Sequence, residues 1–165
     1  EDYRGSIRIG GAELRDIAES ERLRCVGYIS QKTFLFDDTI RNNITLYAAY
    51  PDEAVAEAVR ISGLESMIAS LPDGLDTHIQ ENGKNISGGQ AQRIGIARAA
   101  VRGYRLILAD EITANLDEKT AEEVMSNLLA MNATVIAITH DTQGSFMQRF
   151  DSVYRIEAGA ASKIR

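Results

Sequence analysis

The sequence predicts an α/β fold in which short buried strands are separated by a long helical segment. Leu106 to Ala109 is an unbroken apolar run, and residues 134–139, whose four central residues are apolar, predict a second buried strand; such runs are typical of strands covered on both faces. Between residues 39 and 102 the composition favours helices. The acidic pair Asp110-Glu111 directly follows the first run, at the carboxyl end where open α/β sheets bind their ligands.

The amino-terminal part of the chain predicts short elements. Residues 5–11 alternate and end on two glycines, which predicts a strand and a tight hairpin turn. Leu14 and Ile17, three residues apart, indicate a short helical turn. Residues 23–30 favour a strand, within which the single cysteine, Cys25, is expected to be a small buried residue.

The middle of the chain predicts three helices. Pro51 suits a first helical turn and Gly63 a C-terminal cap, so one helix is expected between them. Residues 64–71 predict a second, short helix that a Pro-Asp-Gly turn stops, and residues 76–85 a loop. Ser87 is a good N-cap residue, and apolar residues at spacings of three and four follow it.

The carboxyl-terminal part predicts one more helix and two strands. Residues 118–131 have helical periodicity, and the apolar strand at residues 134–139 ends at His140. Residues 152–156 are typical of a last, edge-like strand, and residues 157–159 of a turn.

Composition narrows the class of protein. At 165 residues and 18.1 kDa the chain fits one domain or one large fragment, and it is long enough to bury a core. Its net charge of -6 argues against a general nucleic-acid binder, so no nucleic-acid partner is expected. No apolar run approaches the roughly 20 residues that span a bilayer. Any passage through a membrane is therefore expected from another part of the protein or another chain.

Two short motifs suit phosphate chemistry. At Ser87 to Gln90, two glycines let a phosphate approach bare N–H groups at a helix N-terminus. The carboxylates of Asp110 and Glu111 suit Mg²⁺, and the second can also orient or deprotonate an attacking water. Taken alone, each motif has an ordinary alternative, a plain turn in one case and a solvated loop start in the other.

Together these motifs resemble the nucleotide-binding domain of exporter-type ABC transporters. The sequence I-S-G-G-Q at residues 86–90 is similar to the ABC signature, and L-I-L-A-D-E at residues 106–111 to a Walker B strand with its catalytic glutamate. T-A-N-L-D at residues 113–117 resembles the D-loop, and the stretch that begins at Gln31 resembles the Q-loop. An exposed loop glutamine is the alternative for Gln31.

The resemblance implies a P-loop NTPase-like (RecA-like) core sheet with an inserted α-helical subdomain. Residues 1–36 and 103–165 would form the core, and residues 37–102 the helical signature subdomain. The P-loop sequence G-x-x-x-x-G-K-[ST] is not found in these 165 residues. The chain is therefore expected to be an amino-terminally truncated domain that starts after that segment and is inactive on its own.

The resemblance also implies ATP and Mg²⁺ as cofactors and assigns a role to each residue near the strand ends. Asp110 would hold Mg²⁺, and Gln31 would contact both the metal and the attacking water. Glu111 would polarise that water, and His140 would brace the γ-phosphate. For the histidine, a structural role is the alternative.

Two such domains would pair head to tail, so that the signature serves the nucleotide of the opposite subunit. The residues with this role would be Ser87, Gly88, Gly89 and Gln90, and Asp117 would link the two sites. The transmembrane domain would contact the Q-loop region and Glu81, for which a solvated glutamate is the alternative. The protein is then expected at the cytoplasmic face of the cell membrane, either peripheral or fused to its transmembrane domain.

The sequence departs from the family pattern at a few positions. Ile86 replaces the usual leucine, Ala114 stands where serine is common, and Asn115 stands where alanine is common. After His140 the chain has D-T-Q instead of the H-R-L common in exporters. Two alternatives stay open: a non-transport ABC ATPase that acts in DNA repair or translation, and a catalytically silent interaction module.

Overall fold

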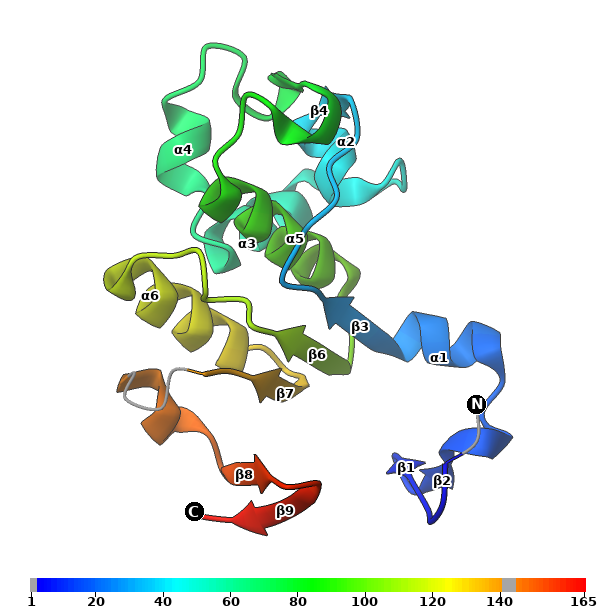
Figure 1. Ribbon diagram of the computed structural model, residues 1–165. Helices are drawn as coiled ribbons and strands as arrows, with labels where there is room; N and C mark the ends of the chain where they lie inside the picture. The colour runs from blue at the N-terminus through cyan, green and yellow to red at the C-terminus, as the bar shows by residue number, and fades with distance from the viewer. Residues whose placement is uncertain (1–2, 141–144) are drawn as a thin grey trace.

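A parallel sheet of three strands lies at the centre of the computed structural model, which describes residues 3–140 and 145–165 (Figure 1). Its strands, in spatial order, are β3 (Val26–Ile29), β6 (Leu106–Asp110) and β7 (Thr134–Ile138). Each pair is joined by a helical crossover, which parallel strands require. All three strands therefore end at the same edge of the sheet.

One face of this sheet is covered by two helices, α5 (Gly88–Arg102) and α6 (Glu118–Leu129). Ile107 and Ala109 point to that face and are buried with residues of both helices. Together they form one hydrophobic core, whose buried members are Ile29, Ile96, Ala99, Ile107, Ala109, Ile112, Val124, Met125, Leu128 and Phe146.

The prediction that the central strands are buried on both faces is wrong. In β7, Ile136 and Ile138 are 54% and 59% exposed, and Tyr28 of β3 is also exposed. In β6, buried and half-buried residues alternate. Among residues 3–140 and 145–165, the helices that pack on the sheet do so from one side.

A second hydrophobic core lies among the helices that precede the signature motif. The helices α2 (Ile40–Thr45), α3 (Asp52–Ile61) and α4 (Glu65–Ala69) surround it, and α5 closes it. Ile94 and Ala97 of α5 belong to this core, whereas Ile96 and Ala99 belong to the core under the sheet. The division at residues 36 and 103 stays a prediction, and α5 is shared between the two cores.

The amino-terminal elements differ from the prediction at one place. The hairpin of β1 (Arg8–Ile9) and β2 (Ala12–Glu13) and the helical turn η1 (Leu14–Asp16) follow the predicted pattern. However, α1 (Glu19–Cys25) occupies the start of the predicted strand. Its acidic first turn and basic last turn complement the helix dipole, which favours a helix here. Cys25 is thus a half-buried helix end and not a buried strand residue.

The remaining elements are short. β4 (Asp38–Thr39) pairs with β5 (His78–Ile79), which lies within the predicted loop between the turns η2 (Gly74–Asp76) and η3 (Glu81–Gly83). The predicted edge strand is one arm of a hairpin, β8 (Tyr154–Glu157) and β9 (Ala160–Lys163), which follows η4 (Ser145–Arg149). The D-T-Q sequence after His140 lies outside the described residues. Within the described ranges, every helix is too short or too polar to cross a bilayer.

A buried polar network holds the segment between β3 and α2. Asn43 is fully buried, and its Oδ1 accepts a hydrogen bond from the backbone N–H of Phe36 at 2.9 Å. Its Nδ2 donates to the carbonyl oxygen of Phe36 at 3.0 Å. From α5, Arg98 donates to the carbonyl oxygens of Phe34 and Asn43, at 2.7 and 2.5 Å. Burial lowers the pKa of the Arg98 guanidinium to about 10, so the group stays charged at neutral pH.

Asp38, at the start of α2, makes the fold sensitive to acid. Its carboxylate accepts hydrogen bonds from the Tyr47 hydroxyl at 2.7 Å, from Asn42 Nδ2 at 2.8 Å and from the Thr39 N–H at 2.6 Å. These contacts, that of Tyr47 first, lower the pKa of Asp38 from its ordinary value of 3.8 to about 2. A depressed folded-state pKa stabilises the fold above the unfolded-state value, and this stabilisation is lost as pH falls through about 2.

We therefore expect Asp38→Asn to lower the melting temperature at neutral pH, by an amount that shrinks as the pH falls from about 5 to about 2. Thermal unfolding followed by circular dichroism across this pH range measures the difference. A difference in melting temperature between wild type and Asp38→Asn that does not change with pH would contradict the lowered pKa of Asp38.

Candidate functional site

Three polar side chains meet where the parallel strands end. Glu111, the first residue after β6, accepts a hydrogen bond from Gln31 Nε2 to its Oε2 at 2.5 Å. His140 Nε2, past the end of β7, lies 2.8 Å from Glu111 Oε1. The glutamate side chain is 24% exposed, whereas that of His140 is 89% exposed. The carboxylate is therefore half-enclosed, with its two partners on the solvent side.

The backbone of Glu111 is held in an unusual conformation. Its φ angle is 49°, in the left-handed region, which costs a residue with a side chain about 1–2 kcal/mol. Its N–H donates to the carbonyl oxygen of Ile138 at 2.9 Å, and its own carbonyl oxygen accepts from the N–H of Ala114 at 3.1 Å. These contacts aim the carboxylate at Gln31 and His140 instead of along the strand.

Asp110 faces a different environment from its neighbour. It is the last residue of β6, and its Oδ2 accepts a hydrogen bond from the Tyr28 hydroxyl at 3.0 Å. This bond raises the pKa of Tyr28. The structure therefore places the two carboxylates of the predicted pair in separate contacts. The sequence did not identify Tyr28 as a partner, because the two residues lie 82 positions apart.

The side-chain oxygens at this edge of the sheet suit a metal ion that is already bound to a phosphate ligand. Within residues 3–140 and 145–165, no three or more His, Cys, Asp or Glu side chains gather to hold a metal ion. Mg²⁺ commonly takes one or two carboxylates and fills its remaining positions with phosphate oxygens and water. Asp110 offers one such carboxylate, and the exposed amide of Gln31 lies at the neighbouring strand end. The residues present therefore fit Mg²⁺ bound to a polyphosphate.

The signature residues build the start of α5. Ser87 is the N-cap, and its Oγ accepts a hydrogen bond from the backbone N–H of Gln90 at 3.2 Å. In return, the Gln90 side chain accepts from the Ser87 N–H at 2.8 Å, which completes a capping box. Gln90 is thus occupied by the helix cap. Gly88 carries no side chain and has open space where a Cβ would lie.

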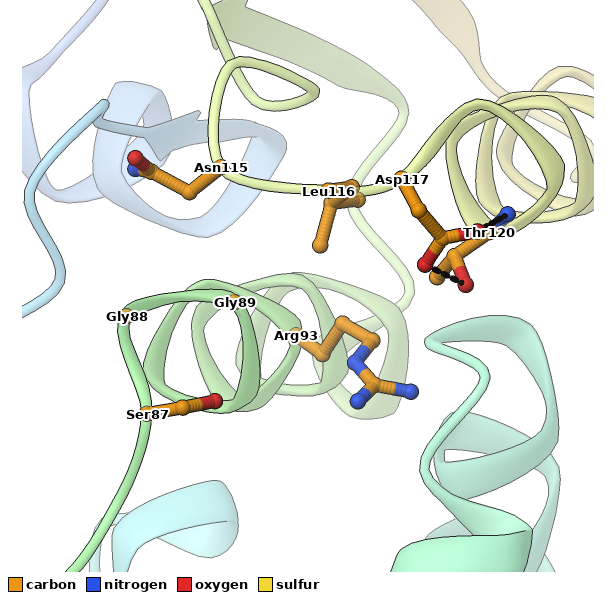
Figure 2. A pocket seen from close by; sticks show the side chains of 8 residues that line it. All are labelled: Ser87, Gly88, Gly89, Arg93, Asn115, Leu116, Asp117 and Thr120. Carbon is orange, nitrogen blue, oxygen red and sulfur yellow. Dashed lines mark hydrogen bonds between the residues drawn. The ribbon is translucent and has the colours of Figure 1, made fainter.

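An open cavity of about 420 Å³ lies beside this helix start (Figure 2). It is lined by Ser87, Gly88, Gly89, Arg93, Asn115, Leu116, Asp117 and Thr120. Figure 2 shows the segment from Asn115 to Asp117 running across the first turns of α5. The cavity therefore contains three of the four residues that the resemblance assigns to the opposite nucleotide, together with Asp117, and it does not contain Gln31, Glu111 or His140.

Asp117 and Arg93 carry the charges of this cavity. Asp117 caps α6, since its carboxylate accepts hydrogen bonds from Thr120 N at 3.0 Å and Thr120 Oγ1 at 2.7 Å. These bonds, more than the nearby charge of Arg93, lower the pKa of Asp117. Arg93 Nη1 donates to the Gly63 carbonyl oxygen at 2.6 Å, while its buried Nε has no partner among the described residues. Sequence reasoning missed Arg93, although it lies on the same helix two turns after Ser87.

The Q-loop region and Glu81 are the predicted contacts of a transmembrane domain, and none of Phe34, Phe36 and Glu81 lines the cavity. Phe34 and Phe36, which follow the Q-loop glutamine, are exposed and pack edge to face with ring centroids 5.1 Å apart. Glu81 is exposed, and its Oε2 lies 3.9 Å from Lys84 Nζ. The aromatic pair belongs to the segment that Asn43 anchors, so it presents a fixed apolar surface.

The two signature glycines should respond differently to an added methyl group. A Cβ on Gly89 would meet the Asn115 carbonyl oxygen at 2.8 Å, whereas one on Gly88 would meet nothing within 4 Å. We expect Gly89→Ala to reduce the free energy of unfolding by about 1–3 kcal/mol. Gly88→Ala, the matched control, should change it by less than about 0.5 kcal/mol or raise it. Urea unfolding measures both, and equal losses would mean that the close approach at Gly89 is not maintained in solution.

Comparisons with known proteins identify a family and several relatives of this chain. A family model described as ABC transporter matches residues 1–114. An ATP-dependent lipid A-core flippase from Vibrio cholerae is 38% identical over 160 residues, which is 94% of this chain and 27% of that protein. A probable ABC transporter ATP-binding/permease protein from Haemophilus influenzae is 37% identical over 159 residues, which is 96% of this chain and 29% of that protein.

A solved structure shares the fold. The structure of a bacterial Atm1-family ABC exporter with ATP bound has a TM-score of 0.86 and 30% sequence identity, over 95% of this chain and 28% of that one. The predicted α/β fold of the P-loop NTPase type is thereby confirmed. The chain spans a little over a quarter of the length of these relatives. It belongs to the ABC transporter family and corresponds to the ATP-binding domain of its exporter-type members.

Proposed function

We propose that this chain is part of an ATPase that powers transport across a membrane, and that Glu111 prepares the attacking water. The observation that carries the proposal is the carboxylate of Glu111, held at 2.5 Å by Gln31 and at 2.8 Å by His140 where three strands end. Phosphoryl transfer needs placement and charge stabilisation more than covalent chemistry. A carboxylate in a fixed orientation can place and polarise the attacking water molecule.

The other residues at the strand ends act on the nucleotide and its metal. Asp110 offers the carboxylate for Mg²⁺, and the exposed amide of Gln31 can turn from Glu111 to the metal or the water. Bound with ATP, Mg²⁺ would neutralise charge on the phosphate oxygens. His140, exposed beside Glu111, is positioned to donate a hydrogen bond to the terminal phosphate.

We propose that the cavity at Ser87 to Gly89 serves the nucleotide of a second copy in a head-to-tail dimer. The support is the separation of the two groups, since none of Gln31, Glu111 and His140 lines this cavity. The start of α5 supplies N–H groups and a positive helix end, which suit a phosphate oxygen. Asp117, anchored at the start of α6, would form the connection to the partner's site.

The exposed aromatic pair suits a membrane partner. We propose that Phe34 and Phe36, together with the exposed Glu81, contact a transmembrane domain. A flippase and an ATP-binding/permease protein are among the relatives, which favours a transporter over an ATPase that acts in DNA repair or translation. The protein would then lie at the cytoplasmic face of the cell membrane.

Replacement of the water-orienting carboxylate tests the proposed role. The test is Glu111→Gln in the full-length protein that contains this chain. The glutamine amide has the same shape as the glutamate carboxylate but is a poor base, so we expect ATP turnover to fall by about 10²–10³-fold. Nucleotide binding should persist, because the amide still pairs with its neighbours. The matched control is Glu123→Gln, which changes an exposed glutamate on α6. This variant protein should hydrolyse ATP at the wild-type rate. Turnover by Glu111→Gln within a few-fold of wild type would refute the role.

The 165-residue chain alone should bind Mg-ATP weakly and show no turnover. It contains no P-loop sequence, so backbone N–H groups and a lysine that would face the polyphosphate are missing from it. The loss of three hydrogen bonds to charged groups would weaken binding by about 5 kcal/mol or more, on the order of 10³-fold. Isothermal titration calorimetry against the full-length protein measures the difference. Micromolar binding with turnover would reveal a phosphate site outside the motifs described above.

A further inference from the structure

Gln92 is a buried amide whose two polar atoms both have partners near the proposed site. It lies in the second turn of α5 and is 1% exposed. Its Nε2 donates to the carbonyl oxygen of Glu111 at 3.2 Å, and its Oε1 accepts from Asn115 Nδ2 at 3.2 Å. A buried polar group without a partner is costly, so these two bonds determine where the amide lies.

The bond from Gln92 reaches the peptide group that sets the direction of the Glu111 side chain. Because Glu111 has a φ angle of 49°, its conformation has to be maintained by neighbouring groups. On the N–H side the neighbour is Ile138 of β7, and on the carbonyl side the neighbours are Ala114 and Gln92. Ile138 and Ala114 contact Glu111 through their backbone groups, whereas Gln92 does so through its side chain and belongs to α5.

We infer that Gln92 is a positioning residue for ATP hydrolysis: its amide fixes the Glu111 peptide group so that the carboxylate lies between Gln31 and His140. Asn115 orients the amide, because its Nδ2 occupies the Gln92 oxygen and leaves the nitrogen directed at Glu111. This inference rests on the proposed function of Glu111 in hydrolysis. It assigns the task of alignment to a residue that does not line the cavity.

A second contact joins the same two segments. The backbone of Asn115 approaches Gly89 so closely that an added Cβ would meet its carbonyl oxygen at 2.8 Å. The segment after β6 thus rests on α5 at two places, Gly89 and Gln92. One rigid helix therefore carries both the cavity face at Ser87 and the amide that holds Glu111.

The decisive variant is Gln92→Met in the full-length protein, because methionine has a similar length and neither donates nor accepts strongly. We expect kcat for ATP hydrolysis to fall by about ten-fold or more, since small misplacements of reacting groups are costly. KM for ATP should stay within about two-fold, because Gln92 takes no part in the cavity. Asn115→Ala should lower kcat by about two- to five-fold. The double variant should be no slower than Gln92→Met, because both changes break one network.

A conservative change adds a pH signature. In Gln92→Glu, the ionised carboxylate faces the Glu111 carbonyl oxygen without a proton to donate, whereas the protonated form restores the donor. Burial favours protonation of such a carboxyl group. The ratio of its kcat to that of wild type should therefore rise as the pH falls. A merely structural role of Gln92 would leave this ratio constant.

Thr45→Val controls for loss of stability alone. Thr45 is a buried residue of α2, and its hydroxyl donates to the Arg41 carbonyl oxygen at 3.0 Å, away from Glu111. It should lower the melting temperature but leave kcat unchanged. The inference is overturned if folded Gln92→Met retains kcat within about two-fold of wild type. If Gln92→Met does not fold, unchanged kcat in Asn115→Ala together with a constant pH ratio in Gln92→Glu overturns it.

The same measurements separate this inference from the proposed function. A wild-type protein without ATPase activity, or one that keeps its activity after Glu111→Gln, would refute the proposed function. A wild-type protein that depends on Glu111 but not on Gln92 would refute the positioning role alone.

Discussion

The parallel hydrogen bonding of β6 between β3 and β7 is the constraint on which the rest of the structure depends. Because the three strands run in the same direction, their carboxyl ends lie at one edge. This brings Gln31 to Glu111 across 80 positions of sequence, and it brings His140 to the other side of the same carboxylate. Parallel strands also require long crossovers, and the chain uses the first of these for the helical segment that ends in α5.

The helix α5 connects this edge to the cavity. Opposite sides of it enter the two hydrophobic cores, so its position is fixed from both directions. Its first turn presents Ser87, Gly88 and Gly89 to the cavity, and its second turn directs Gln92 at the backbone of Glu111. The geometry of two sites far apart in the sequence thus depends on the packing of one helix.

The contacts of the charged groups follow from this arrangement. Asp110 and Glu111 are adjacent in the chain, yet they point to different partners, because a side chain at a strand end and one in a left-handed residue leave the backbone in different directions. Asp117 is held by the helix it caps, which fixes the end of the same segment. The residues proposed for the metal, the water and the partner thus lie at the end of one strand and in the segment after it.

The sequence by itself determined the α/β class, the helix start at Ser87 and the strand that precedes Asp110, because capping residues and apolar runs act locally. The sequence also identified the motif at residues 87–90 and the acidic pair at residues 110–111. Only the tertiary structure decided that the described helices cover one face of the sheet, that Cys25 ends a helix and that Tyr28 pairs with Asp110. The contacts of Gln92 and Arg93 were likewise not predictable from the sequence, since the partners of these buried polar groups lie far away in the chain.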